Sequence, residues 1–133
     1  MSQHYEVFYC LERSIRQLVQ GRMKEAKGLA WWDSHVPQAV RDEVRKNQDR
    51  ERDSGMTLRS EDPLDYTTFG QLGEVINTNW DVFSDTFNSQ RAVSKVMTQL
   101  NTLRGPIAHC CPLSEDEIAR LRLSVRDWFR LME

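Results

Sequence analysis

The chain has 133 residues, of which 39% are hydrophobic and 29% are charged, and its formal net charge is −2. This length favours one domain with a single buried core, and the composition excludes a disordered chain. A generally basic nucleic-acid binder is also excluded, because such proteins concentrate Lys and Arg. The sequence contains neither a run of about 18 apolar residues nor a signal-peptide pattern, so we expect a cytosolic protein without a membrane partner.

The first predicted helix spans about residues 2–27, where apolar side chains recur at steps of three and four residues. Ser2 can cap its beginning and Gly28 can end it. The side chains expected to face the core are Phe8, Leu11, Ile15, Leu18 and Arg22 or Met23.

A second, shorter and more exposed helix is predicted within residues 29–48. Val36, Val40 and Val44 repeat every four residues, and Pro37 suits a first helical turn. The sequence then becomes rich in charges of both signs and poor in apolar residues, so it cannot bury much surface. We therefore expect the helix to fray into a mobile charged connection at about residues 48–63 of the single domain 1–133.

A third helix is predicted from about Thr68 to Phe83. Gly70 and Gly73 weaken it by roughly 1 kcal/mol each relative to Ala, so we expect them to permit close packing against a neighbouring helix. Its inward side chains are expected to be Phe69, Leu72, Ile76, Trp80 and Phe83.

A fourth helix should begin near Ser89, and its apolar period continues in phase across Gly105-Pro106. Its predicted buried face is Val93, Val96, Met97, Leu100, Leu103 and Ile107.

A fifth helix has a capping box from Ser114 to Glu117, with a hydrophobic staple between Leu113 and Ile118. Its predicted inward face is Ile118, Leu121, Val125, Trp128 or Phe129, and Met132. Because no alternating strand pattern of useful length occurs, the chain is predicted to be an all-α bundle of five helices.

Arg104 and His109 flank the Gly105-Pro106 pair near the end of the fourth helix. On an undistorted helix, residues five apart point about 140° from each other. Pro106 has no N–H for the Thr102 carbonyl and crowds it, so the helix should kink or end here and can bring the two side chains onto one rim. The alternative is that both side chains only cap the last helical carbonyls.

An Arg-His pair has a chemistry suited to RNA. The arginine guanidinium binds phosphate oxygens, and histidine accepts and donates protons near neutral pH, so the two can cleave RNA at a 2′-hydroxyl without a metal or cofactor.

The adjacent His109-Cys110-Cys111 triplet is not a zinc motif, because neighbouring residues rarely converge on one ion. With Cys10 the cysteines number three, an odd count, so reduced thiols are expected. Cys110 and Cys111 are expected to be buried small apolar residues.

The stretch RGPIAHC followed by PLSEDEIARLRL resembles the HEPN superfamily of α-helical domains, whose mark is Arg, four to six residues, then His. It is most similar to the branch named after a nuclear mRNA quality-control endonuclease, with looser likeness in YCLERSIRQLV and GEVINTNWDVF. The resemblance implies a four- or five-helix domain that dimerises around the motif helices, with Arg104 and His109 as the catalytic pair of a metal-independent endoribonuclease. Where the family favours a polar residue, commonly Asn, this chain has Gly105.

Three interpretations therefore remain. The first is a homodimeric endoribonuclease of a toxin, antiviral or RNA-quality system; the second is a catalytically silent HEPN module for dimerisation or nucleic-acid binding in a larger complex, which Gly105 favours. The third is a helical interaction domain with a tryptophan-rich surface. Arg122, Arg126 and Arg130 recur every four residues and can contact RNA phosphates, or can form an ordinary solvated face.

Overall fold

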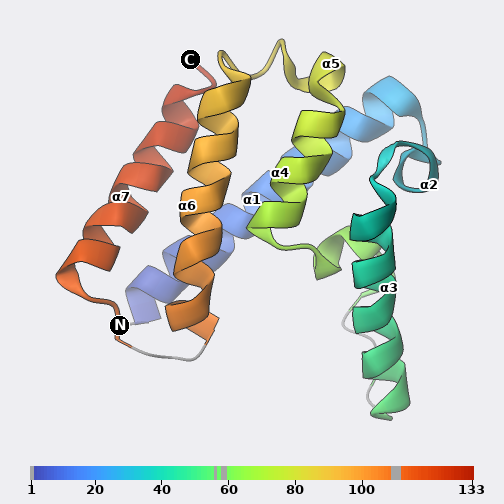
Figure 1. Ribbon diagram of the computed structural model, residues 1–133, viewed down its shortest axis with the longest axis horizontal. Helices are drawn as coiled ribbons and strands as arrows, with labels where there is room; N and C mark the ends of the chain where they lie inside the picture. Colours follow the sequence, from blue (N-terminus) through green and yellow to red (C-terminus); the bar gives the residue numbers. More distant parts are fainter. Residues whose placement is uncertain (1, 56, 58–59, 109–111) are drawn as a thin grey trace.

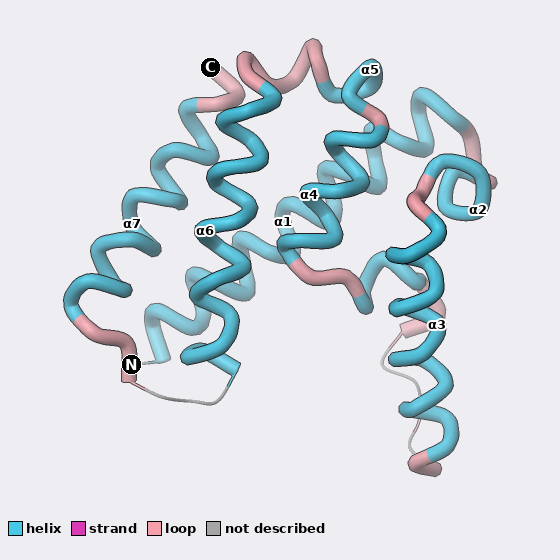
Figure 2. Tube along the Cα trace, in the orientation of Figure 1, coloured by secondary structure: helices cyan, strands magenta, loops and turns pink. Residues whose placement is uncertain are grey.

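The structure is a computed structural model that describes residues 2–55, 57, 60–108 and 112–133. Throughout these ranges the regular secondary structure is helical, and the helices are joined by short loops (Figure 2). The predicted all-α class is confirmed. None of the described helices is both long enough and apolar enough to cross a membrane.

Four helices form the body of the molecule. α4 (Phe69–Thr78), α6 (Gln90–Ala108) and α7 (Glu115–Arg130) lie side by side, and α1 (Ser2–Lys27) crosses behind them (Figure 1). α6 packs against α4 on one side and α7 on the other, and α1 contacts both outer helices. The core lies between α1 and this layer. Its fully buried members include Phe8, Ile15, Met23, Phe69, Leu72, Ile76, Val93 and Leu100.

α1 has the predicted bounds. Gly28 ends it with a φ of 85°, which glycine adopts without strain, and its N–H donates to the Lys24 carbonyl at 3.0 Å. The Ser2 side chain lies outside the described part of the chain. One predicted core position of α1 is wrong. Leu18 was expected to be buried but is half-buried, whereas its neighbour Val19, four residues after Ile15, is fully buried.

The second predicted helix is two helices, α2 (Trp31–His35) and α3 (Gln38–Asp53). Pro37 is responsible, since a residue before proline avoids the helical region, and Val36 is extended with φ −100° and ψ 136°.

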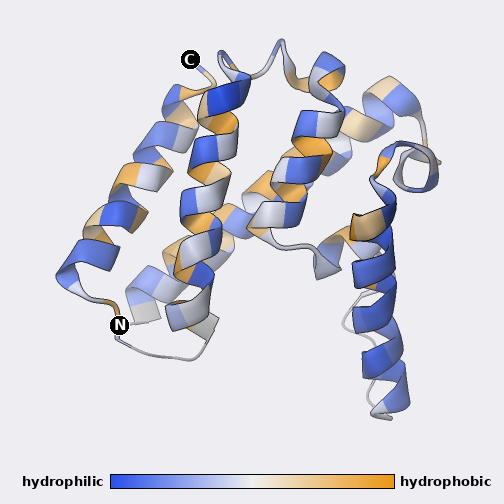
Figure 3. Ribbon diagram, in the orientation of Figure 1, coloured by the Kyte–Doolittle hydropathy of each residue, from blue (hydrophilic) through white to orange (hydrophobic). Residues whose placement is uncertain are grey.

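The end of α3 lies beyond the predicted end near residue 48, so the first residues of the expected connection are helical. Arg, Lys, Gln and Glu favour helix, and Arg52 pairs with Asp49 at 3.2 Å. This hydrophilic half of α3 extends away from the body (Figure 3). A short 3₁₀ helix, η1 (Pro63–Tyr66), then leads to α4.

The third predicted helix is also divided, into α4 and α5 (Trp80–Phe83). Asn79 separates them with φ −112° and ψ 40°, and its buried Nδ2 donates to the carbonyls of Val75 and His35. The side chain thus satisfies a carbonyl at the end of α4 and ties it to α2. Thr68 caps α4, and Gln71 completes the capping box.

The glycines of α4 allow the close approach that the sequence predicted. A Cβ at Gly73 would lie 3.2 Å from Met97 Cβ, and one at Gly70 would lie 3.2 Å from Asn101 Nδ2. Both neighbours belong to α6. The close α4–α6 contact therefore depends on the lack of side chains at Gly70 and Gly73.

The predicted buried face of α6 is confirmed at every position. The helix does not end at Gly105-Pro106 but continues to Ala108, the last residue described before His109. Pro106 costs one hydrogen bond close to the end of the helix, while Ile107 beyond it is buried and holds the last turn against the core.

α7 begins with the predicted capping box, in which Ser114 Oγ accepts from the Glu117 N–H and Glu117 Oε1 accepts from the Ser114 N–H. Trp128 is buried and Phe129 is exposed, which decides between the two candidates for the core.

Candidate functional site

Arg104 projects from the last turns of α6 into an open, polar cleft of about 720 Å³. Leu103 and Ile107 beside it are each 2% exposed, as predicted, so burial of these two residues turns the Arg104 side chain outward. Arg104 itself is exposed and makes no hydrogen bond or ion pair to any described residue. Its guanidinium is therefore available to an anion.

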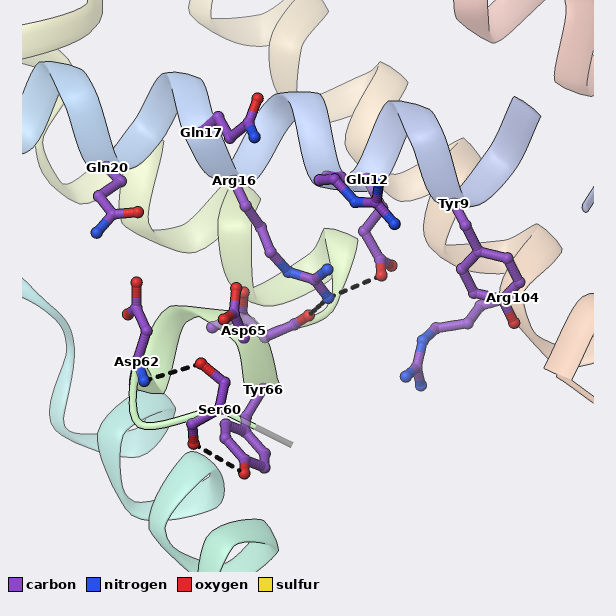
Figure 4. Close-up of a pocket in the computed structure, with 12 residues that line it drawn as sticks. Tyr9, Glu12, Arg16, Gln17, Gln20, Ser60, Asp62, Asp65, Tyr66 and Arg104 are labelled. Atoms are coloured by element: carbon purple, nitrogen blue, oxygen red, sulfur yellow. Dashed lines mark hydrogen bonds and ion pairs between the residues drawn. The ribbon is translucent and has the colours of Figure 1, made fainter. Parts of the chain in front are cut away.

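The cleft brings together three segments that are far apart in the sequence. α1 forms one wall, residues 60–67 with η1 form the opposite wall, and α6 contributes Arg104 at one end (Figure 4). The lining residues of α1 are Tyr9, Glu12, Arg13, Arg16, Gln17 and Gln20.

Glu12 and Arg16 form the floor. Arg16 Nη2 donates to Glu12 Oε1 at 2.7 Å and to the Thr67 carbonyl at 2.6 Å, and the two side chains are only 18% and 6% exposed for Arg16 and Glu12. A charged pair of this kind stays buried when its members are also hydrogen-bonded. One guanidinium thus joins α1 to the segment that leads into α4.

The opposite wall is held by hydrogen bonds of its own. The Tyr66 hydroxyl donates to the Ser60 carbonyl at 3.2 Å, and Ser60 Oγ accepts from the Asp62 N–H at 3.0 Å. Asp62 Oδ1 in turn accepts from the Leu64 N–H at 3.0 Å and caps η1. Asp65 is half-buried and accepts no hydrogen bond from a described residue, so its carboxylate is open to the cleft.

A family model described as Swt1-like HEPN matches residues 6–133. The chain belongs to the Swt1-like HEPN family. Membership indicates an RNase-type or nucleotide-binding module, and it confirms the resemblance carried by the Arg104-to-His109 segment. No curated protein and no solved structure gives a significant match to the chain.

In this HEPN domain the second predicted catalytic residue, His109, lies outside the described residues, as do Cys110 and Cys111. The approach of His109 to Arg104 therefore stays a prediction. Among the residues that the structure does describe, no three His, Cys, Asp or Glu side chains gather closely enough to hold a metal ion.

The predicted RNA-binding pair Arg122 and Arg126 lies on α7, away from the Arg104 cleft. Both side chains are exposed, and Arg126 Nε lies 4.0 Å from Asp127 Oδ1. Arg126 lines a separate groove of about 300 Å³ between α6 and α7 with Leu123. RNA contacts at these arginines would form a second surface of the HEPN domain.

The tryptophans belong mainly to the interior of the HEPN domain. Trp31 and Trp128 are buried, while Trp32 and Trp80 are half-buried and pack against the core. This arrangement leaves little tryptophan surface for the interaction domain considered as a third interpretation.

Sequence reasoning missed the α1 wall and the acidic wall of the cleft. A signal was present for α1, where Tyr9, Arg13, Arg16 and Gln20 recur at steps of three and four residues on the polar side of the helix. No comparable signal marked Asp65, because its place opposite α1 depends on the path of the chain after α3.

Proposed function

We propose that this HEPN domain is a metal-independent endoribonuclease with Arg104 and His109 as its catalytic residues. The observation that carries the proposal is the Arg104 guanidinium, which has no partner among the described residues and stands at the end of an open polar cleft. A fixed positive group at such a position binds a phosphodiester and becomes more effective as negative charge develops on the phosphorus oxygens.

His109 acts on the proton of the ribose. It accepts the 2′-hydroxyl proton, the 2′-oxygen attacks phosphorus, and the bond from phosphorus to the 5′-oxygen breaks. A proton donated to that oxygen completes the reaction, which leaves a 2′,3′-cyclic phosphate and a 5′-hydroxyl. In a homodimer formed around the motif helices, the histidine of the second copy supplies that proton. The reaction needs no cofactor.

A role in a toxin, antiviral or RNA-quality system fits this activity, because such systems use nucleases that cut RNA without a bound cofactor. The enzyme would act on cytoplasmic RNA, and a regulatory protein or a larger complex would restrain it.

The silent HEPN module is the second candidate, and Gly105 favours it. A Cβ at this position would meet nothing within 4 Å, so the fold does not require glycine here. The chain thus lacks the polar side chain that the family commonly places beside the motif arginine, although space for it exists. A domain of this kind would bind RNA or dimerise without cutting.

Cleavage of a labelled single-stranded RNA in EDTA distinguishes the two candidates. We expect Arg104→Ala and His109→Ala each to lower the cleavage rate by about 100-fold or more, as loss of one charge-stabilising group does elsewhere. Arg50→Ala is the matched control, since Arg50 is exposed on α3 and does not line the cleft, and it should cleave at the wild-type rate.

The products should carry cyclic phosphate ends, which resist a phosphatase until acid opens the ring. RNA that is bound but left intact by the wild type would support the silent module, and cleavage that persists in both mutants would identify a contaminant. Light scattering measures whether the protein has the mass of two chains.

A further inference from the structure

The two walls of the Arg104 cleft differ in charge. Arg13 on α1 and Arg104 on α6 are exposed and have no partner among the described residues. Asp62 and Asp65 lie on the opposite wall, toward the end of the cleft away from Arg104 (Figure 4). A phosphate is attracted to the first side and repelled by the second. A nucleotide in the cleft therefore places its backbone along α1 and α6 and its base against residues 60–67.

The acidic wall contains a carboxylate that lacks hydrogen-bond donors within the described part of the chain and is open to the cleft. The carboxylate of Asp65 accepts no hydrogen bond and forms no ion pair with a described residue. An ionised carboxylate can only accept hydrogen bonds, so the base that binds here must supply N–H groups.

Guanine is the base that fits this requirement. Its Watson–Crick edge carries an imino and an amino N–H side by side, which match the two oxygens of one carboxylate. Adenine and cytosine place an acceptor nitrogen beside their amino group, and uracil flanks its imino group with two carbonyls, so each of them brings an oxygen or nitrogen lone pair against the carboxylate.

Tyr9 provides a surface for the base at the Arg104 end. Tyr9 is 46% exposed, and its ring lies nearly perpendicular to the buried Phe8 ring, with the two ring centres 5.4 Å apart and an angle of 87° between the planes. This contact holds the ring in place while leaving it accessible. Stacking of bases on exposed aromatic rings is common in proteins that bind single-stranded RNA.

We infer that the cleft is a guanine-recognition subsite for single-stranded RNA, in which Asp65 determines the specificity and Tyr9 stacks on a base next to the phosphate held by Arg104. The inference rests on the proposed binding of RNA. Paired guanine is excluded because its Watson–Crick edge is already occupied, so duplex RNA should bind weakly.

Binding tests this without depending on turnover. The probe is a fluorescent 2′-O-methyl oligouridine with one central guanine, which cannot be cleaved, compared by anisotropy with oligomers that carry adenine or inosine instead. The wild type should bind the guanine oligomer roughly tenfold more tightly than the adenine oligomer, and inosine, which lacks only the amino group, should fall between them.

Asp65→Asn should remove the preference for guanine, and Glu61→Gln should keep it, because Glu61 is exposed and does not line the cleft. Tyr9→Ala should lower the affinity for all three oligomers by about tenfold, and Tyr9→Phe should bind them with wild-type affinity.

Equal affinity of the wild type for guanine, inosine and adenine would overturn the inference, and this comparison does not depend on the folding of any variant. Retention of the preference by Asp65→Asn would also overturn it. In both cases, if Arg104→Ala no longer bound any of the three oligomers, the proposed RNA-binding site at Arg104 would still be supported. Failure of the wild type to bind any of the oligomers would overturn the subsite and the proposed function together.

Discussion

Gly73 and Gly105 are both glycines inside helices, yet their surroundings are opposite. At Gly73 an added Cβ would meet Met97 Cβ at 3.2 Å, so α4 and α6 approach each other through the missing side chain. At Gly105, on the exposed side of α6, the same atom would meet nothing within 4 Å. Packing explains the first glycine and does not explain the second.

The contrast separates two requirements on the same helix. The buried face of α6 is determined by the shape of its neighbours, while the face that carries Arg104 is determined by what it binds. Substitutions at the first face should change stability, and substitutions at the second should change activity.

Gly73→Val should have the largest effect on stability. The branched side chain would press on Met97 across the α4–α6 contact, and overpacking of this kind costs about 1–3 kcal/mol of unfolding free energy. Urea unfolding followed by circular dichroism measures the loss. A wild-type midpoint in this variant would show that the contact is looser than the 3.2 Å distance indicates.

Gly105→Ala should have the opposite sign and a smaller size. Alanine is favoured over glycine in a helix by up to about 1 kcal/mol, and there is open space for its methyl group. Gly105→Asn should raise the free energy of unfolding by only a few tenths of about 1 kcal/mol. It should also raise the rate of RNA cleavage by about tenfold, because its amide can support the Arg104 guanidinium through one charge-assisted hydrogen bond. The alanine variant is the control for the asparagine variant, and equal rates in the two would contradict the supporting role.

Asp81→Asn should have the smallest effect, because it changes an ion pair whose carboxylate is 67% exposed to solvent. The Lys27 ammonium donates to Asp81 Oδ2 at 3.0 Å, and this hydrogen bond lowers the pKa of the carboxyl below its usual 3.8. The stabilisation is therefore present above that pH and is lost as the pH falls through the lowered pKa. The variant should unfold at slightly lower urea than the wild type near pH 7, and the difference should shrink below about pH 4. A difference that is independent of pH would mean that the charge of Asp81 does not matter.

The sequence predicted the elements whose signals are local. The capping box at Ser114 fixed the start of α7, Gly28 fixed the end of α1, and the apolar period of α6 identified each of its buried side chains. These features depend on residues at most a few positions apart, so they can be recognised without knowing the fold.

The features that the sequence did not predict depend on distant contacts. Asn79 divides a helix because its side chain reaches the carbonyl of His35, and the cleft exists because residues 60–67 return to α1. For the candidate site, Arg104 was predicted and is placed at the cleft, while Tyr9 and Asp65 were not found because no short-range pattern links them to Arg104.

The double hydrogen bond of Arg16 has a consequence for how this domain can diversify. By holding Glu12 and the Thr67 carbonyl together, Arg16 ties the cleft floor to the residue before the cap of α4. Residues at the rim, such as Tyr9 and Asp65, take no part in that tie. New substrate preferences can therefore arise by substitution of rim side chains while the contacts of Arg16 stay unchanged. Replacement of Arg16 would instead disturb the packing of α1 against the segment that leads into α4.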